Sequence, residues 1–328
     1  MKLVADNKIP HVADFFTLCE DIVYLPGEEI SHADLINTDL LLVRTVTHVD
    51  EKLLKNTNVK WVGTATTGTD HVDMQWLSKN HIAFADAAGA NANAVLDYVL
   101  SCVAELKNHA YLSKKNRVAG IIGCGRIGRL VARALKTLGF QVVCYDPLLT
   151  EKLDFDFVKL ETLLRESDFI TLHTPLTKTG SHPTYHLIDK QQLDQMQTHS
   201  IVLNCARGAV INQTALLQTK HIFICLDVWE NEPHISLELL NKVTIGTPHI
   251  AGYSVQAKFC ATRRMYESAA QLFGWPPSHH VIIIPNTPSL YDPLAHTAQF
   301  RAAFAGQKDP EIIKKIFIEE RKRYPLKY

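Results

Sequence analysis

Short apolar runs recur along this chain of 328 residues, and polar or helical stretches separate them. Such runs, when turn residues bound them, are typical of buried strands. They occur at 3–5, 40–43, 61–63 and 82–85, and again at 118–122, 141–145, 169–172, 201–204, 222–226 and 243–245. Strands that alternate with helices predict an α/β fold built on parallel sheets.

Apolar residues also recur at helix spacing in several of the intervals. These patterns run from Asn93 to Leu106, after Gly128, from Val255 to Phe273, and from Ile312 to Phe317. The pattern at 255–273 is long enough to return the chain to the first group of strands. We therefore expect the second group of strands to form a domain inserted within the first.

A glycine-rich turn follows the apolar run at 118–122. It reads Gly123-Cys124-Gly125-Arg126-Ile127-Gly128, and a helical pattern begins within it. GxGxxG between a strand and a helix predicts the phosphate-binding turn of a doubly wound, Rossmann-type domain. Gly123 would allow the tight turn, Gly125 would let a pyrophosphate approach the backbone, and Gly128 would let the helix pack against the strand.

An acidic residue follows the next predicted strand. Asp146 lies 18 residues after Gly128, where a carboxylate can bind the ribose hydroxyls of a dinucleotide. The same charge would repel the 2'-phosphate of NADP, and Pro147 follows it in place of an arginine. The sequence therefore favours NAD as the cofactor.

Three later strand ends carry an arginine, three acids and a histidine. They read Asn204-Cys205-Ala206-Arg207, Asp227-Val-Trp-Glu-Asn-Glu232-Pro and Thr-Pro-His249. A guanidinium can hold a substrate carboxylate, an imidazole can move a proton, and an acid can orient the imidazole. This combination is typical of a hydroxy-acid dehydrogenase. Glu230 lies two residues from Glu232, and from spacing alone either could partner the histidine.

Composition narrows the function further. Hydrophobic residues make up 46% of the chain, enough for two buried cores. The 34 basic residues balance 34 acidic ones, so we expect neither a nucleic-acid partner nor a membrane partner. The short apolar stretch at the start is not a signal peptide, which predicts a cytoplasmic protein.

Cysteine and histidine spacings give no local metal motif. The seven cysteines form no CxxC pair and are expected to be reduced core thiols. The 16 histidines, with the adjacent His279 and His280 among them, form no HxxxH or HExxH on a predicted helix. We therefore expect no metal site.

The glycine turn, Asp146-Pro147, Ala206-Arg207-Gly208, the 227–233 segment and Thr-Pro-His249 together resemble the D-isomer-specific 2-hydroxyacid dehydrogenases in order and spacing. The resemblance implies a Rossmann-type NAD-binding domain at 93–255, inserted in a flavodoxin-like α/β substrate domain at 1–92 and 256–275. It also implies a homodimer. Relatives carry a longer C-terminal dimerisation domain, so 276–328 would be a shortened segment of that type.

The resemblance also implies residue roles. Arg207 would bind the substrate carboxylate, Glu232 would partner the histidine, and His249 would transfer the proton. Cofactor contacts are implied at Gly123, Gly125, Arg126, Ile127, Gly128, Asp146, Thr174, Cys205, Ala206, Arg207, Asp227 and Gly252. Substrate contacts are implied at Thr45, Thr66 and Tyr253, and Arg44 is the nearest candidate cation for a substrate phosphate.

The segments 43–47, 62–73 and 249–253 most resemble the subgroup that oxidises 4-phospho-D-erythronate in vitamin B6 biosynthesis. This implies NAD-dependent formation of the 2-oxo acid, 3-hydroxy-2-oxo-4-phosphobutanoate. Three alternatives stay open. The substrate could be another D-2-hydroxy acid such as phosphoglycerate, glycerate or lactate. The chain could be an NAD-sensing, co-repressor-like binding protein, or an inactive relic.

Overall fold

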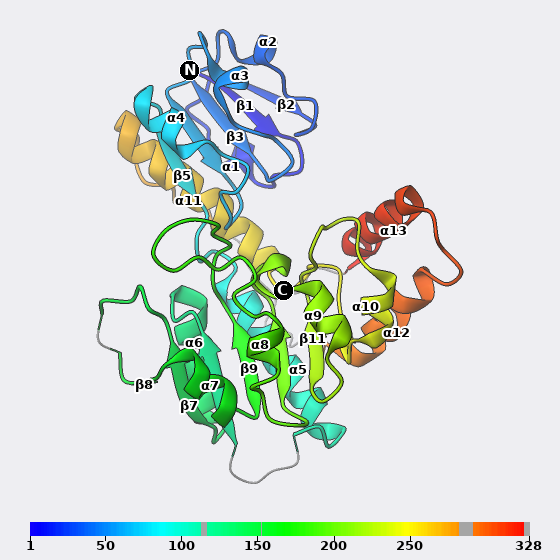
Figure 1. Cartoon of the computed structure of the whole chain (residues 1–328). Helices are drawn as coiled ribbons and strands as arrows, with labels where there is room; N and C mark the ends of the chain where they lie inside the picture. The colour runs from blue at the N-terminus through cyan, green and yellow to red at the C-terminus, as the bar shows by residue number, and fades with distance from the viewer. Residues whose placement is uncertain (113–116, 152, 282–290, 325–328) are drawn as a thin grey trace. The chain divides into compact units, whose positions relative to one another are not determined.

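A computed structural model describes the whole chain except residues 113–116, 152, 282–290 and 325–328 (Figure 1). The chain divides into two compact units. The first unit contains 1–91 and the described residues of 253–281, and the second contains 92–252 and the described residues of 291–324. Residues 92–252 of the second unit thus interrupt the first unit, and the described residues of 291–324 add a later segment to the second unit.

The first unit is built on a five-stranded parallel sheet in the order β2-β1-β3-β4-β5. The strands are β1 (Lys2–Asp6), β2 (Asp21–Leu25), β3 (Leu40–Val43), β4 (Trp61–Thr64) and β5 (Ala83–Asp86). This order is the flavodoxin-like one. β2 is not among the strands predicted from the sequence, because this strand lies at the sheet edge and its side chains are only partly buried.

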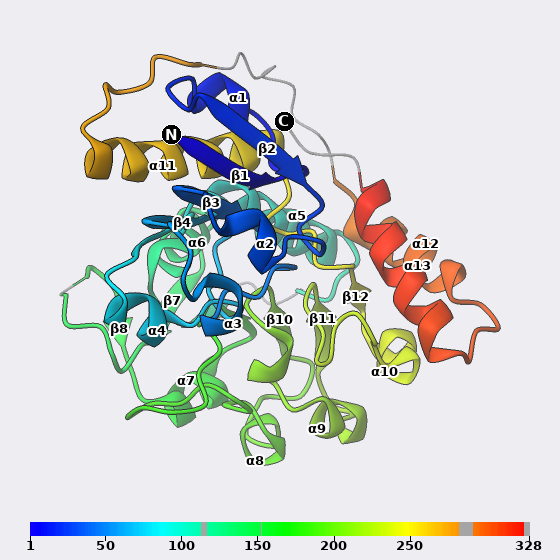
Figure 2. The ribbon, with the colours of Figure 1, turned by 90° about the horizontal axis from the view of Figure 1, so that it is seen from above.

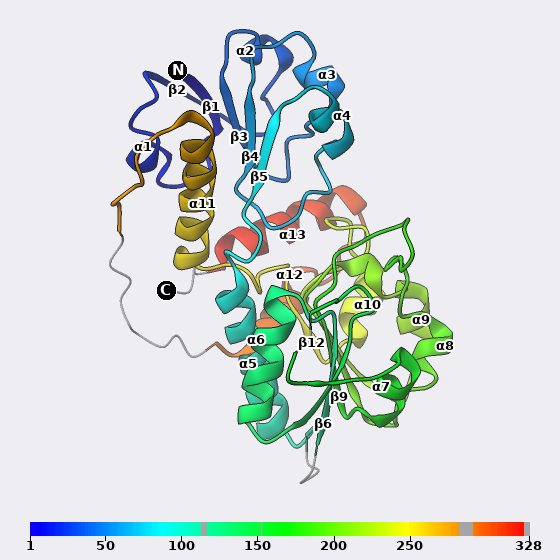
Figure 3. The same cartoon turned by 90° about the vertical axis from the view of Figure 1, so that its left-hand side faces the viewer.

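Helices cover both faces of this sheet (Figure 3). The helices α1 (Val12–Phe15) and α11 (Val255–Phe273) pack on one face, around Phe15, Phe16 and Met265. The opposite face carries α2 (His32–Leu35), α3 (Glu51–Leu54) and α4 (Met74–Lys79). Coverage on both sides explains why β3 is a run of four fully buried apolar residues rather than an alternating pattern.

The second unit is built on a seven-stranded parallel sheet in the order β12-β11-β10-β9-β6-β7-β8. The strands are β6 (Val118–Ile122), β7 (Gln141–Tyr145), β8 (Asp156–Phe157), β9 (Phe169–Leu172), β10 (Ile201–Asn204), β11 (Phe223–Leu226) and β12 (Ile245–Gly246). Counted from β6, this is the Rossmann order with a seventh strand added at one edge. The strand order reverses between β6 and β9, which is where such sheets bind their ligands.

Two helical layers enclose this sheet (Figure 3). On one face lie α5 (Ala92–Asn108) and α6 (Arg126–Thr137), which pack against each other. On the other lie α7 (Leu160–Glu166), α8 (Lys190–Leu193), α9 (Gln213–Gln218) and α10 (Leu237–Lys242), and the short 3-10 helix η1 (Gly208–Val210) follows β10. The predicted α/β fold with a doubly wound parallel sheet is therefore confirmed.

The C-terminal helices lie in the segment 276–328, for which the sequence predicts a shortened dimerisation-type segment. α12 (Pro293–Ala303) lies beside β12 at the sheet edge of the second unit, and α13 (Pro310–Arg323) packs against α12 (Figure 2). Phe300, Phe304 and Phe317 are buried in the same core as Trp229. These apolar side chains fix the helices to the second unit, while 282–290 and 325–328 lie outside the described residues.

None of the described helices is long and apolar enough to span a membrane.

Candidate active site

The glycine turn at the end of β6 has the geometry that a dinucleotide needs. Gly123 adopts φ +90°, and its N–H donates to the carbonyl of Tyr145 at 2.8 Å. A Cβ at Gly128 would overlap the carbonyl of Gly123, whereas a Cβ at Gly125 would meet nothing within 4 Å. The turn is therefore tightly packed at Gly128 and open at Gly125. The open side suits a pyrophosphate beside the N-terminus of α6.

Asp146 is held at the end of β7 beside this turn. Its Oδ2 accepts from the Cys124 N–H at 2.8 Å, and its Oδ1 accepts from the Leu148 N–H at 3.2 Å. The carboxylate is half-buried, so one side of it remains accessible. This placement fits a residue that binds ribose hydroxyls.

The other predicted nucleotide contacts in the second unit vary in exposure. A Cβ at Gly123 would meet Thr174 Cγ2, so Thr174 adjoins the turn, and its Oγ1 is buried with no hydrogen-bond partner among the described residues. Arg126 is exposed, while Ile127, Cys205 and Gly252 are half-buried. The residues that fit the cofactor best are therefore those of the turn, with Asp146 and Thr174.

Alanine at the two glycines should separate folding from cofactor binding. Gly128→Ala should lower the free energy of unfolding by about 1–3 kcal/mol, because the backbone of the turn must shift. Gly125→Ala should leave that free energy unchanged and raise the Kd for NADH about tenfold or more, because its methyl occupies the pyrophosphate position. Urea unfolding and NADH fluorescence titration measure the two effects. Equal NADH affinity in Gly125→Ala and the wild type would remove the turn from the cofactor site.

His249 and Glu232 form a hydrogen-bonded pair. His249 Nδ1 lies 2.7 Å from Glu232 Oε2, and Glu232 Oε1 accepts from the Trp229 N–H at 2.6 Å. Burial acts to raise the pKa of Glu232, but the charge and hydrogen bond of His249 and the Trp229 N–H together hold it below the usual value. The carboxylate is therefore ionised at neutral pH and fixes the ring of His249 through one nitrogen.

The neighbouring acid has a different partner. Glu230 Oε1 lies 2.9 Å from His186 Nε2, and its Oε2 accepts from the Gln213 N–H at 3.1 Å. Glu230 thus connects the 227–233 segment to the loop before α8 through one oxygen and to the start of α9 through the other. Spacing left Glu230 and Glu232 equivalent, and the geometry pairs His249 with Glu232.

The Glu232–His249 and Glu230–His186 pairs allow a matched test of the role of Glu232. Glu232→Gln should lower kcat/KM about tenfold to a hundredfold, because a neutral amide loses a charge-assisted hydrogen bond to the imidazolium. Glu230→Gln removes the same charge two residues away and should change kcat/KM far less. Steady-state kinetics across pH measures both variants, and equal losses in the two would rule out a specific role for Glu232.

A buried network holds the loop that carries His249. The carboxylate of Asp227 accepts from Thr247 Oγ1 at 2.6 Å and from the N–H groups of Ile250 and Ala251 at 2.8 and 2.9 Å. Burial raises the pKa of Asp227, and the charge of His249 and these hydrogen bonds offset part of the shift. His249 itself adopts φ +57°, a conformation that few non-glycine residues take and that a surrounding structure must enforce.

Thr247 extends this network into the core. The hydroxyl of Tyr98, on α5, lies 2.7 Å from Thr247 Oγ1, and Trp229 Nε1 donates to the Thr247 carbonyl at 2.8 Å. Asp227 is therefore positioned to organise the loop around His249, in addition to the cofactor contact that the family resemblance implies. Tyr98 and Thr247 are not predicted from the sequence, since no local motif links residues so far apart in the chain.

Arg207 lies in a tight turn after β10. Asn204 spans this turn, because its Oδ1 accepts from the Ala206 N–H at 3.0 Å and its Nδ2 donates to the Arg207 carbonyl at 2.9 Å. Arg207 Nη1 donates to the Ala206 carbonyl at 2.8 Å. A Cβ at Gly208 would overlap the backbone of Trp229, so this turn packs directly against the segment that carries Glu232.

The predicted substrate residues belong to the first unit. Arg44 Nη2 lies 2.8 Å from Asp6 Oδ2, and Asp6 is fully buried, so the guanidinium already has an acidic partner. Thr66 Oγ1 lies 2.7 Å from Thr64 Oγ1, Thr45 is exposed, and the ring of Tyr253 lies 5.2 Å from Lys258 Nζ. No local motif in the sequence indicates that Arg44 pairs with Asp6.

Comparison with known proteins agrees with this geometry. Residues 100–251 match the family described as the NAD-binding domain of D-isomer-specific 2-hydroxyacid dehydrogenases. The chain is 47% identical to an erythronate-4-phosphate dehydrogenase of Coxiella burnetii, over 83% of this chain and 75% of that protein. It is 37% identical to an enzyme of the same name from Acinetobacter baumannii, over 100% of this chain and 97% of the other.

Solved structures share the fold. A protein of Thermus thermophilus superposes with a TM-score of 0.72 and 25% identity, covering 84% of this chain and 98% of its own. A D-lactate dehydrogenase of Aquifex aeolicus, complexed with NAD and lactic acid, gives a TM-score of 0.68 and 24% identity, covering 84% and 96%. The latter likeness supports the fold alone.

Proposed function

This chain belongs to the erythronate-4-phosphate dehydrogenases of the D-isomer-specific 2-hydroxyacid dehydrogenase family, and we propose that it oxidises 4-phospho-D-erythronate with NAD. The product is the 2-oxo acid, 3-hydroxy-2-oxo-4-phosphobutanoate, on the route to pyridoxal 5'-phosphate. The single observation that supports the chemistry is the hydrogen-bonded pair of His249 Nδ1 and Glu232 Oε2, 2.7 Å apart, in the unit that has the dinucleotide-binding fold. The identity to enzymes of this name supports the choice of substrate.

His249 is the proposed proton acceptor. When its Nδ1–H donates to Glu232, Nε2 carries the free lone pair and can take the proton from the substrate hydroxyl at C2. The ionised Glu232 then stabilises the imidazolium that forms. When the 2-oxo acid is reduced, the protonated His249 donates the proton instead.

Arg207 is the proposed binder of the substrate carboxylate, through its planar guanidinium. NAD, when bound, supplies the acceptor for the C2 hydride. The open side of Gly125 suits its pyrophosphate, and the fixed carboxylate of Asp146 suits its ribose hydroxyls.

The direct test follows NADH formation with purified protein, NAD and a panel of D-2-hydroxy acids, with a ketone trap to pull the reaction forward. The expected result is a kcat/KM that is highest for 4-phospho-D-erythronate. A preference for phosphoglycerate, glycerate or lactate would keep the chemistry and change the substrate. If no acid of the panel led to NADH formation although the protein bound NADH, the proposal would be overturned.

Arg44 is proposed to bind the substrate phosphate, but the buried Asp6 beside it neutralises part of its charge. Arg44→Ala should raise KM for the phosphorylated substrate by about tenfold to a hundredfold, because a charged hydrogen bond contributes about 1.5–3 kcal/mol. It should change KM for D-erythronate, which lacks the phosphate, far less. An equal change for both acids would remove Arg44 from the phosphate site.

We also propose a homodimer in the cytoplasm. The family resemblance supports the dimer, and sedimentation of the purified chain tests it. All seven cysteines are free thiols in the structure, which is typical of a reducing compartment and supports the location. Fractionation of cells that express the chain tests the second part.

A further inference from the structure

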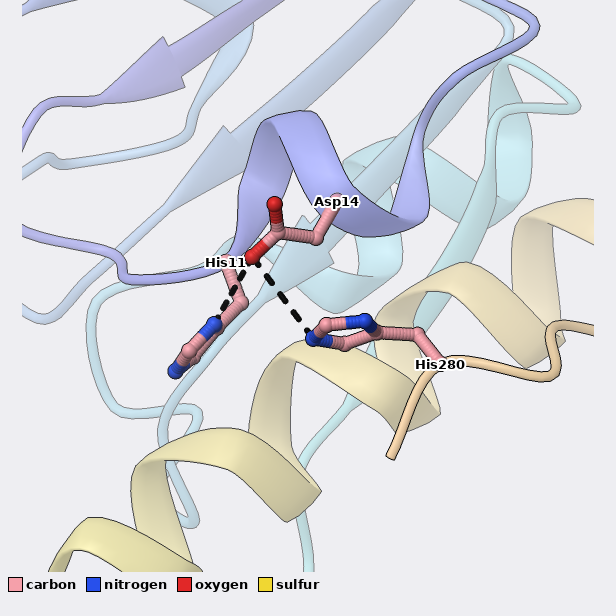
Figure 4. Close-up of side chains that lie close together, drawn as sticks. All are labelled: His11, Asp14 and His280. Carbon is pink, nitrogen blue, oxygen red and sulfur yellow. Dashed lines mark hydrogen bonds and ion pairs between the residues drawn. The ribbon is translucent and has the colours of Figure 1, made fainter. Parts of the chain in front are cut away.

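Two histidines and one aspartate meet on the first unit, outside the residues proposed for catalysis (Figure 4). His11 immediately precedes α1, Asp14 lies on α1, and His280 lies in the segment that follows α11. Their ligand atoms all lie within 4.8 Å of one another. We name these three residues the His-Asp-His cluster and propose that it is a binding site for a divalent transition metal, with Zn²⁺ as the expected ion.

The spacing of the ligand atoms suits such an ion. His11 Nδ1 lies 2.8 Å from Asp14 Oδ2, and His280 Nε2 lies 3.6 Å from the same oxygen. Ligand atoms at about 2.0–2.1 Å from a tetrahedral zinc are about 3.3 Å apart, midway between these two distances. Small side-chain rotations would therefore place all three atoms around one ion, with a water molecule as the fourth ligand.

His280 is the residue that most points to a ligand. Its Nε2 is buried from solvent and makes no hydrogen bond with any of the described residues. The Asp14 oxygen 3.6 Å away is too distant for a hydrogen bond, although an ion pair is possible when the ring is protonated. A buried polar atom without a partner is costly, and a metal held between the two groups would satisfy it.

The surroundings place both imidazoles against an apolar wall. The ring of Phe259, on α11, lies 5.5 Å from His11 and 5.6 Å from His280 between centroids, and Phe15 lies 5.2 Å from His280. Phe15 and Phe259 are both buried. The apolar side lowers the local dielectric, while Asp14 remains half-exposed and leaves a route for the ion.

Contacts other than those of the cluster hold the segment that carries His280. Trp275 stacks on Tyr266 with centroids 6.0 Å apart, and the Tyr266 hydroxyl donates to the Pro276 carbonyl at 2.6 Å. The His280 N–H donates to Ser278 Oγ at 3.1 Å. The cluster is thus partly preorganised, and a bound metal would further tie this segment to α1.

The donor set selects the class of ion. Two imidazole nitrogens and one carboxylate oxygen suit Zn²⁺, Ni²⁺ or Co²⁺, whereas Mg²⁺ and Ca²⁺ prefer sites built from oxygen atoms alone. No metal site is predicted from the sequence, since His11, Asp14 and His280 form no local motif. Only the packing of α1 beside the segment after α11 brings them together.

The test is Zn²⁺ titration of the full chain after chelator treatment, by isothermal calorimetry, with Mg²⁺ as the comparison ion. We expect one zinc per chain, no Mg²⁺ binding at this site, and affinity losses of at least about tenfold in His11→Asn, Asp14→Asn and His280→Gln. His279→Gln is the matched control, because the neighbouring His279 is exposed and lies outside the cluster. This variant should bind zinc as the wild type does.

A second readout keeps the test independent of catalysis. Zinc should raise the Tm of the wild type and of His279→Gln, and it should not raise the Tm of His280→Gln. The Tm of each variant without zinc verifies that it folds. Zinc affinity that is unchanged in all three cluster variants, or that is lost in His249→Asn instead, would overturn the proposal.

Discussion

His249→Asn should abolish most hydride transfer while NADH binding stays intact. General acid–base catalysis contributes about 10²–10⁴-fold in rate, so kcat should fall by about that factor. Asparagine is the informative replacement, because His249 adopts φ +57° and asparagine tolerates this left-handed conformation better than most residues. The amide cannot accept the substrate proton, but the loop around it should keep its shape.

Steady-state kinetics and NADH fluorescence titration together decide this prediction. The Asp227 hydrogen bonds to the N–H groups of Ile250 and Ala251 do not involve the imidazole, so they should hold the loop in the variant. Loss of NADH binding with the loss of turnover would identify His249 as a structural residue rather than the proton acceptor.

Arg207→Ala should lower kcat/KM by about 10²–10⁴-fold. The guanidinium is proposed to make two charge-assisted hydrogen bonds to the substrate carboxylate, and each contributes about 1.5–3 kcal/mol. Arg207→Lys should retain part of the activity, since an ammonium keeps the charge but lacks the planar fork. The expected order of kcat/KM is therefore wild type, lysine, alanine.

The control for this series is thermal unfolding of both variants. Arg207 Nη1 donates to the Ala206 carbonyl, so removal of the side chain could loosen the turn as well as the substrate site. The two bonds that Asn204 makes across the turn do not use the guanidinium and should preserve it. Unchanged kcat/KM in the alanine variant would exclude Arg207 from substrate binding.

The sequence by itself determined the α/β class, the dinucleotide turn and the order of the strand ends that carry chemistry. Each of these depends on neighbouring residues: an apolar run such as Leu40–Val43 identifies a buried strand, and GxGxxG followed by Asp146 identifies a strand-turn-helix unit. The edge strand β2 was missed because partial burial weakens the same signal.

Only the tertiary structure decided which groups meet. Glu230 and Glu232 are equivalent in spacing, and the fold of the turn gives one to His186 and the other to His249. Core packing of Phe300 and Phe317 fixed the tail helices to the second unit. Such contacts depend on chain segments far apart in sequence, and no local periodicity encodes them. Asp14 and His280 are separated by most of the chain, yet they lie within one cluster.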